Sequence, residues 1–430
     1  MFVSQLTQLA SQNDLSQVEG TPDAPKVSAD DSAPPNGGLR AWLQVLGSFF
    51  LFFNTWGIIN SYGVFQTYYE QSLLQGTNAS TISWIGSLQS FLIMFLGVLT
   101  GPIYDAGHTL SLLYIGSFLV VLGHMMLSLC EKVWQVFLAQ SICVGIGAGL
   151  LFVPSIAILS AYFTTKLPFA VSIAACGSSI GGVVYPIVIR DLISRLGFAW
   201  SVRIAGFLAL FGLTLSCLVM RVRTLPATRR KLVDWTSFRD IPYILFNIGM
   251  FLCFMGLYTP YFYVQSIANQ NHTVSAGLVF YLLPIINASS TLGRLVPGYL
   301  SQIMGSFNII VPCSVISGAL ILCLLAVHSQ GALLAFCVLY GCFSGSLVSL
   351  SGPVLVCLSP HVGVIGTRMG MCFTILSIAL LIGTPISGAI LDASGANSTW
   401  IFSGCLTLAG GIVLGIARMT KTSWRAFTKV

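Results

Sequence analysis

Long apolar runs alternate with short polar segments along the chain from about residue 40 onward. A helix of about 20 apolar residues crosses the hydrocarbon core of a bilayer. Windows of that length recur twelve times, two of them separated only by Glu131 and Lys132. The pattern predicts an all-α membrane protein with twelve transmembrane helices, near 42–64, 82–104, 110–130, 133–160, 169–190, 199–220, 241–264, 275–300, 308–328, 331–357, 366–391 and 399–418.

A basic segment at 221–240 divides these spans six and six, and prolines recur in both sets. Pro154 and Pro186 each have a counterpart 199 residues later, at Pro353 and Pro385. Two parallel six-helix repeats with a substrate site between them are the arrangement of the major facilitator superfamily, which this pattern resembles. We expect a disordered cytosolic tail at 1–40, helix bundles at 41–220 and 241–418, a cytosolic central loop at 221–240 and a cytosolic tail at 419–430.

Composition agrees with a membrane location. Of the 430 residues, 55% are hydrophobic and 7% are charged, whereas an ordinary soluble domain has about 25% charged residues. The net charge of +7 forms no dense basic stripe, so nucleic acid is not an expected partner. The twelve cysteines lie mostly in apolar runs, without a CxxC pair or a Cys/His cluster. We therefore expect no metal, no other cofactor and no enzyme activity.

The positive charges predict the orientation, because cytosolic loops retain Lys and Arg. With both termini in the cytosol, 14 of the 19 basic residues are cytosolic, four are outside, and Arg294 lies within a span. Sequons at Asn78, Asn271 and Asn397 then fall in external loops and are predicted glycosylation sites. We expect a multi-pass protein of the cell membrane with both termini cytosolic.

Four stretches of the chain carry a resemblance to a known family. They are 35–42 before the first span, 175–182 on span five, 257–263 on span seven and 293–298 on span eight. Together they resemble the fungal branch of the monocarboxylate porter family. The chain departs from that family at Asn36, where Asp is usual. It also keeps only Gly101, Asp105 and Gly107 of the superfamily's loop motif after span two.

Polar residues within the spans are the candidate substrate ligands, because an ionisable group in a membrane is costly. Arg294 shares one face of span eight with Asn287 and Ser290, at helical spacings of three, four and seven. A guanidinium pairs bidentately with a carboxylate, which favours an organic anion as solute. The alternative is that Arg294 extends to the membrane surface and only stabilises the fold.

Spans seven and one supply further candidates. Tyr258 and Tyr261 share a face beside Pro260, which interrupts the helix and frees backbone groups to line a cavity. Asn54 and Asn60 on span one are candidates of the same kind. Helix packing is an equal alternative for all four residues. Asp105, at the cytosolic end of span two, is predicted to act in gating.

The resemblance implies a carrier that moves a small organic solute by alternating access. The expected solute is a monocarboxylate or related organic acid, carried across a fungal membrane. Animal lactate carriers of that family have Lys and Asp where Asn60 and Ser290 stand here, so a larger organic acid or a neutral metabolite is favoured over lactate. Alternatives are an efflux carrier for a secondary metabolite and, more remotely, a membrane sensor that does not transport.

Overall fold

We analysed a computed structural model of the chain, which describes residues 35–428 except 165, 224–231, 271–273, 361, 423, 426 and 427. The first six spans, here called the first half, begin with α2 (Leu39–Asn54), α3 (Trp56–Asn60), α4 (Tyr62–Tyr68) and the π-helix η1 (Tyr69–Leu73). They continue with α5 (Ala79–Asp105), α6 (Thr109–Leu127), α7 (Val133–Val136), the π-helix η2 (Phe137–Val144), α8 (Gly145–Ser160) and α9 (Leu167–Val219).

The second half contains the other six spans and begins after a short 3₁₀ helix, η3 (Trp235–Arg239). Its helices are α10 (Ile241–Leu257), α11 (Thr259–Gln270), α12 (Ala276–Val279), α13 (Leu282–Met304), α14 (Ser306–Cys323), the 3₁₀ helix η4 (Leu324–Ala326), α15 (Gln330–Leu358) and α16 (Val362–Lys421). Most of the predicted tail at 1–40, and three of the six basic residues of the central loop at 221–240, lie outside the described residues.

The described part of the chain contains ten helical segments long and apolar enough to cross a membrane, and no strand. Two of them, α9 and α16, have 53 and 60 residues, each more than twice the length of one span. Each is interrupted by a glycine with positive φ, Gly197 at 78° and Gly395 at 79°. Only glycine adopts this conformation without strain, so the chain reverses there. Twelve spans and the all-α fold are thereby confirmed.

The first span is longer than its hydropathy indicates. The apolar pattern ends near residue 64, but helical structure continues to Leu73, with interruptions at Thr55 and Ser61. The expected end of this span was wrong because polar side chains in the last two turns lower the hydropathy there. Tertiary contacts provide partners for some of them: Gln66 is buried and bonds to Glu70, and Glu70 accepts a hydrogen bond from Ser266 of the second half.

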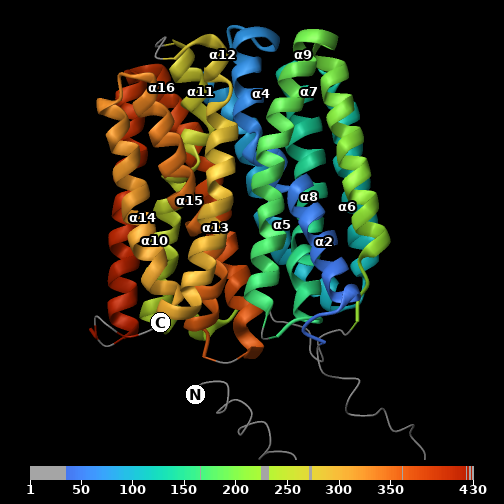
Figure 1. The fold of residues 1–430 in the computed structure, drawn as a ribbon, viewed down its shortest axis with the longest axis vertical. Coiled ribbons are helices and arrows are strands. Elements are labelled where there is room, and N and C mark those ends of the chain that lie inside the picture. The colour runs from blue at the N-terminus through green and yellow to red at the C-terminus, as the bar shows by residue number, and fades with distance from the viewer. Residues whose placement is uncertain are drawn as a thin grey trace, which may run out of the picture. The chain divides into compact units, whose positions relative to one another are not determined.

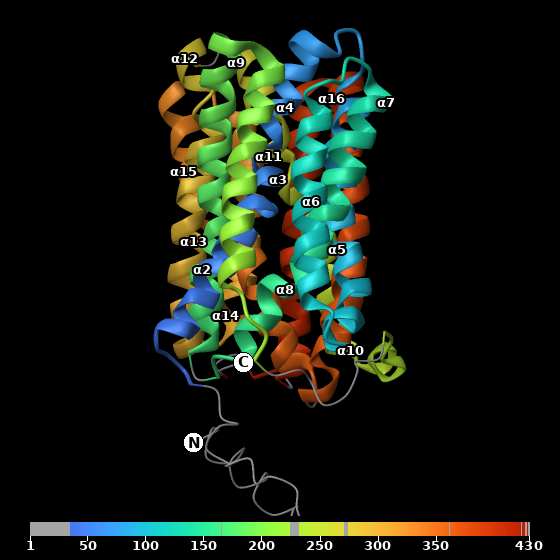
Figure 2. The same cartoon turned by 90° about the vertical axis from the view of Figure 1, so that its right-hand side faces the viewer.

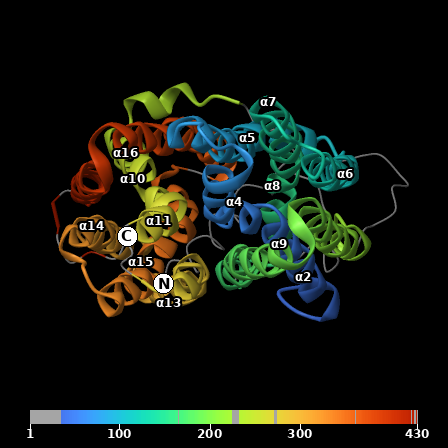
Figure 3. The same ribbon diagram turned by 90° about the horizontal axis from the view of Figure 1, so that it is seen from above.

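The two halves lie side by side, and two long helix pairs join them (Figures 1 and 3). Helix α5 packs along α16, and α9 packs along α13. At one end, visible at the top of Figure 1, α4 of the first half also packs on α11 of the second. Within the first half, Gly57 meets the backbone of Gly181, where a Cβ atom would lie 2.8 Å from the neighbouring Cα. Small residues at this contact thus permit close backbone approach.

Candidate functional site

Arg294 lies in the contact between the two halves. The residue is 5% exposed, and its Nη1 donates hydrogen bonds to the carbonyl of Ala175, at 2.8 Å, and to the hydroxyl of Ser178. Its guanidinium is therefore turned toward α9 and does not extend to the membrane surface. Among the described residues, none accepts a hydrogen bond from the buried Nε. Arg294 thus keeps one unused donor in a buried place.

Asn287 lies two turns before Arg294 on the same face of α13. Its amide nitrogen donates to the carbonyls of Asn60 at 3.2 Å, Gly182 at 3.1 Å and Leu283 at 3.1 Å. A Cβ atom at Gly182 would collide with the Asn287 amide, so glycine is required for this approach. The buried Oδ1 has no hydrogen-bond partner among the described residues. This oxygen is an unused acceptor on the same face of α13 as the unused Nε donor of Arg294.

Ser290 completes the polar stripe on α13. Its hydroxyl lies 3.2 Å from the hydroxyl of Ser179 on α9. All three residues that the sequence placed on one face of span eight are therefore buried against the same helix of the opposite half. We call Arg294, Asn287 and Ser290 the α13 stripe.

Span seven is interrupted where Pro260 predicted. Helix α10 ends at Leu257 and α11 begins at Thr259, with Tyr258 between them. The freed carbonyl of Leu257 accepts a hydrogen bond from the Tyr340 hydroxyl at 2.5 Å. The backbone group is thus satisfied by a side chain, which makes the break tolerable inside the bundle.

The two tyrosines at this break border the α13 stripe. The rings of Tyr258 and Tyr261 lie 5.6 Å apart, and the Tyr261 hydroxyl is 3.2 Å from that of Ser344. Both tyrosines lie close enough to Arg294 to interact with it electrostatically. Aromatic faces, hydroxyls and a guanidinium therefore come together, which suits a partly apolar solute with an acidic oxygen.

The two asparagines of span one differ in their surroundings. Asn60 takes part in the contact with the α13 stripe, because its carbonyl accepts from Asn287 and its amide donates to the Ser178 carbonyl at 3.4 Å. Asn54 accepts a hydrogen bond from Tyr185 at 2.6 Å and donates to the Phe50 carbonyl. Its amide is engaged within the first half. Asp105 is buried as the last residue of α5, just before Gly107 turns the chain toward α6 with φ 91°.

Glu70 is a functional candidate that the sequence analysis did not identify. Its Oε2 accepts a hydrogen bond from Ser266 of α11 at 2.5 Å, and its Oε1 accepts one from Gln66 at 2.6 Å. The carboxylate thereby joins the first half to the second, at the end where α4 packs on α11. The four-residue spacing of Gln66 and Glu70 was the available signal, since such pairs face each other on a helix.

We expect Glu70→Ala and Ser266→Ala each to loosen the contact between the ends of α4 and α11. A hydrogen bond to a charged group contributes about 1.5–3 kcal/mol, so local opening should become about 10- to 100-fold more frequent. Hydrogen–deuterium exchange should then be faster in both helix ends. Thr67→Ala is the matched control, because the Thr67 hydroxyl donates to the Gly63 carbonyl of its own helix. Unchanged exchange in α11 would show that Glu70 does not hold the halves together.

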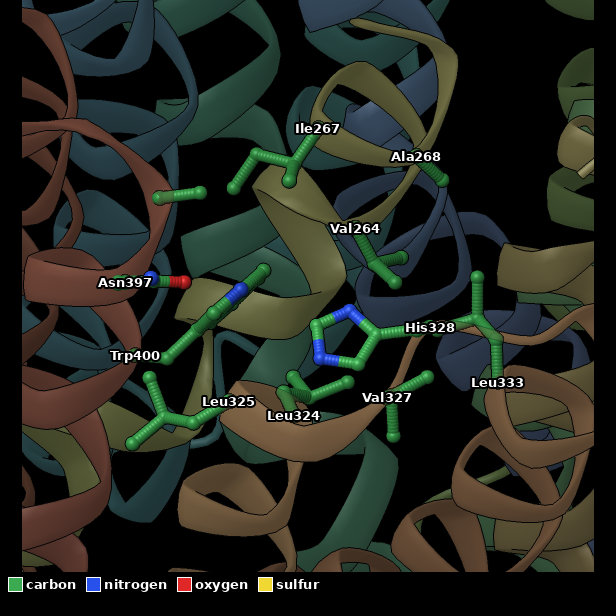
Figure 4. A pocket seen from close by; sticks show the side chains of 11 residues that line it. Val264, Ile267, Ala268, Leu324, Leu325, Val327, His328, Leu333, Asn397 and Trp400 are labelled. Carbon is green, nitrogen blue, oxygen red and sulfur yellow. The ribbon is translucent and has the colours of Figure 1, made fainter. Parts of the chain in front are cut away.

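A separate cavity of about 80 Å³ lies within the second half, among α11, η4, α15 and α16. His328, Asn397 and Trp400 border it together with aliphatic side chains (Figure 4). None of the residues that line it belongs to the α13 stripe or to the tyrosine pair. It is therefore distinct from the candidate substrate site.

Comparison with known proteins places the chain in a family. Residues 45–316 match the Major Facilitator Superfamily. The chain belongs to this superfamily. A mutant of the nucleoside transporter NupG has a similar fold, with a TM-score of 0.66 over 88% of this chain and 99% of that chain, at 15% sequence identity. Membership makes the protein a multi-pass membrane transporter of small solutes and not an enzyme.

Several relatives within the superfamily are fungal. The MFS-type transporter dbaD of Emericella nidulans is 46% identical over 92% of both chains. The aspyridones efflux protein apdF of Emericella nidulans is 37% identical over 96% of this chain and 85% of the relative. An agnestins efflux protein of Paecilomyces divaricatus is 36% identical over 93% of this chain and 94% of the relative. These relatives support the efflux alternative, whereas the monocarboxylate porter branch stays a prediction.

Proposed function

We propose that this protein exports an organic secondary metabolite across a fungal membrane by alternating access. The observation that carries the proposal is the α13 stripe, which is buried between the halves with the Nε of Arg294 and the Oδ1 of Asn287 unpaired among the described residues. Buried polar atoms in proteins are rarely left unpaired, so these two are candidates for pairing with a solute. Similarity to proteins named for the efflux of aspyridones and agnestins supports export as the direction.

The residues at the site define the class of solute. Arg294 favours an acidic oxygen, and Asn287 Oδ1 offers an acceptor for a hydroxyl or amide of the solute. Tyr258 and Tyr261 add aromatic surface beside the α13 stripe, which suits a partly apolar solute. A monocarboxylate is the narrower candidate within this class, and Asn60 is proposed to assist through its contact with Asn287.

Alternating access requires the contacts between α13 and α9 to break and form again. In the described structure the Nη1 of Arg294 donates to the Ala175 carbonyl and to the Ser178 hydroxyl. A solute oxygen that replaces them would free α13 from α9 without leaving the guanidinium unpaired. Solute binding would thereby lower the barrier to the rocking of the two halves.

Efflux from a fungal host tests the function. The full chain would be expressed in yeast lacking its own drug exporters, and the cells would be loaded with a panel of labelled acidic and neutral aromatic metabolites. We expect faster, saturable loss of one acidic member from expressing cells. Arg294→Gln at equal abundance is the control for a transport-specific effect. Saturable uptake of simple monocarboxylates without efflux would overturn export and favour the monocarboxylate interpretation.

We also propose that both termini are cytosolic and that the protein resides in the cell membrane. Asn78 and Asn397 are exposed, as glycan acceptors must be, whereas Asn271 lies outside the described residues. Glycosidase treatment should increase the mobility of the wild-type protein in gels, and less so after Asn78→Gln or Asn397→Gln. A tag at either terminus that is labelled on intact cells would contradict this orientation.

Asp105 is proposed to act in gating at the cytosolic end of α5. Because Asp105 is buried beside the turn formed by Gly107, its substitution should affect the movement of α5 and α6 more than solute binding. We expect Asp105→Asn to lower the maximal transport rate several-fold with little change in the solute concentration for half-maximal rate. Loss of affinity at an unchanged rate would assign Asp105 to the binding site instead.

A further inference from the structure

The segment before α10 exposes an unusual amount of apolar surface. Trp235 is 77% exposed, Phe238 58% and Ile241 62%, and Leu232 and Val233 are also exposed. All but Ile241 precede the spanning segment that begins at that residue. Exposed apolar side chains on the spans themselves face lipid tails, but these lie beyond the end of the span. Figures 2 and 3 show this short yellow-green coil at the rim of the bundle beside α10.

Two ion pairs hold this segment in place. Arg368 of α16, whose side chain is 3% exposed, donates from Nε to Asp234 at 2.9 Å and from Nη1 to Asp240 at 2.6 Å. Asp234 also accepts hydrogen bonds from the backbone and the hydroxyl of Thr236 at the start of η3. The hydroxyl of Thr236 and the guanidinium of Arg368 lower the pKa of Asp234. The exposed side chains are therefore presented by a defined structure.

The ion pairs also determine the charge of the exposed surface. Asp234 and Asp240 are both turned toward Arg368, whose single positive charge offsets one of their two negative charges. Arg239 is exposed on the same 3₁₀ helix as Trp235 and Phe238. In the sequence, Arg229, Arg230 and Lys231 come directly before Leu232. By sequence, these four basic residues outnumber the one negative charge that Arg368 leaves over, so the segment is both apolar and net positive.

We propose that this surface, formed by Leu232, Val233, Trp235, Phe238, Arg239 and Ile241, binds anionic phospholipid headgroups of the cytosolic leaflet. Tryptophan favours the headgroup level of a bilayer, where its ring is buried and its N–H stays wet. Basic residues next to such rings attract anionic lipids. Through Arg368 the bound lipid would hold the second half at a fixed depth while the first half moves. The inference concerns the lipid and does not depend on the exported solute.

The depth of Trp235 in the bilayer, and its preference for anionic lipid, can be measured on the full-length protein. The protein would be reconstituted in phosphatidylcholine vesicles that contain phosphatidylserine. The fluorescence of Trp235 would be obtained by subtracting the emission of Trp235→Phe from that of the wild-type protein. Quenchers would be acrylamide in the water and a headgroup nitroxide carried either on phosphatidylserine or on phosphatidylcholine at equal mole fraction. Trp134→Phe supplies the matched control, since Trp134 is also exposed but lies beside Glu131 and Lys132, whose charges cancel.

We expect the nitroxide to quench Trp235 about fivefold more strongly on phosphatidylserine than on phosphatidylcholine, as for one basic residue near an anionic surface. Arg239→Gln should lower this ratio of quenching, and Trp134 should be quenched equally by the nitroxide on either lipid. Equal quenching by both lipids would overturn the proposal. So would quenching by acrylamide alone, which places the ring in water. Protection from all three quenchers would also overturn it, because protein then covers the surface.

Discussion

Arg294→Lys is expected to weaken transport of an acidic solute even though the positive charge is kept. An ammonium cannot reproduce the planar array of donors with which Arg294 contacts α9 and would contact the solute. Loss of one charge-assisted hydrogen bond in a buried site costs about 1.5–3 kcal/mol, or about 10- to 100-fold in apparent affinity. Concentration dependence of efflux, with surface abundance measured in parallel, provides the readout.

A structural role for Arg294 makes a different prediction. If the residue only joins α13 to α9, Arg294→Lys should change the rate equally for acidic and neutral solutes. Arg195→Lys is the matched control, because that arginine forms an exposed ion pair with Asp191 within one helix. Normal affinity and rate in both Arg294→Lys and Arg294→Gln would exclude Arg294 from the substrate site. The search would then move to Tyr258, Tyr261 and Asn60.

Arg368→Gln should produce the largest loss of stability. It removes the cation that is paired with both Asp234, 10% exposed, and Asp240, 27% exposed. Breaking a buried ion pair costs about 3–5 kcal/mol, and the partial exposure of Asp240 favours the lower end of that range. The variant also loses the contact of the guanidinium with the Tyr243 ring, 5.1 Å away. Thermal unfolding in detergent should show a clear decrease in Tm.

Neutralising the two acids should rescue this variant. Asp234→Asn and Asp240→Asn combined with Arg368→Gln leave no uncompensated charge, so much of the lost stability should return. The pH dependence adds a check. The lowered pKa of Asp234 means that its contribution is complete above the ordinary pKa of an aspartate and is lost as pH falls through the lowered value. Wild type should therefore lose more stability in acid than the triple variant; equal acid sensitivity would contradict the ion-pair account.

Features set by the bilayer could be predicted from local sequence. Apolar windows of one span length yielded twelve helices, because lipid requires each crossing to be helical and apolar. The interruption beside Pro260 could be predicted because proline has no backbone N–H to continue the helix. The common face of the α13 stripe followed from helical spacing alone. The orientation of that face, toward α9 of the other half, did not.

Contacts between distant positions were decided only by tertiary structure. The charge of Glu70 lowers the local hydropathy and so argues against a membrane span at that position. In the fold, the hydroxyl of Ser266, 196 positions away, donates a hydrogen bond to its carboxylate. Asn54 resembles a cavity residue in the sequence, but Tyr185 engages it within the first half.

By itself, the sequence determined the twelve spans, their division into two sets of six and the break in span seven, because these depend on neighbouring residues and on the thickness of the membrane. Only the tertiary structure decided that Arg294 faces α9 and that Arg368 forms ion pairs with Asp234 and Asp240. The reason is physical: whether a charge can be buried depends on the partner that folding brings to it, and that partner is remote in the chain.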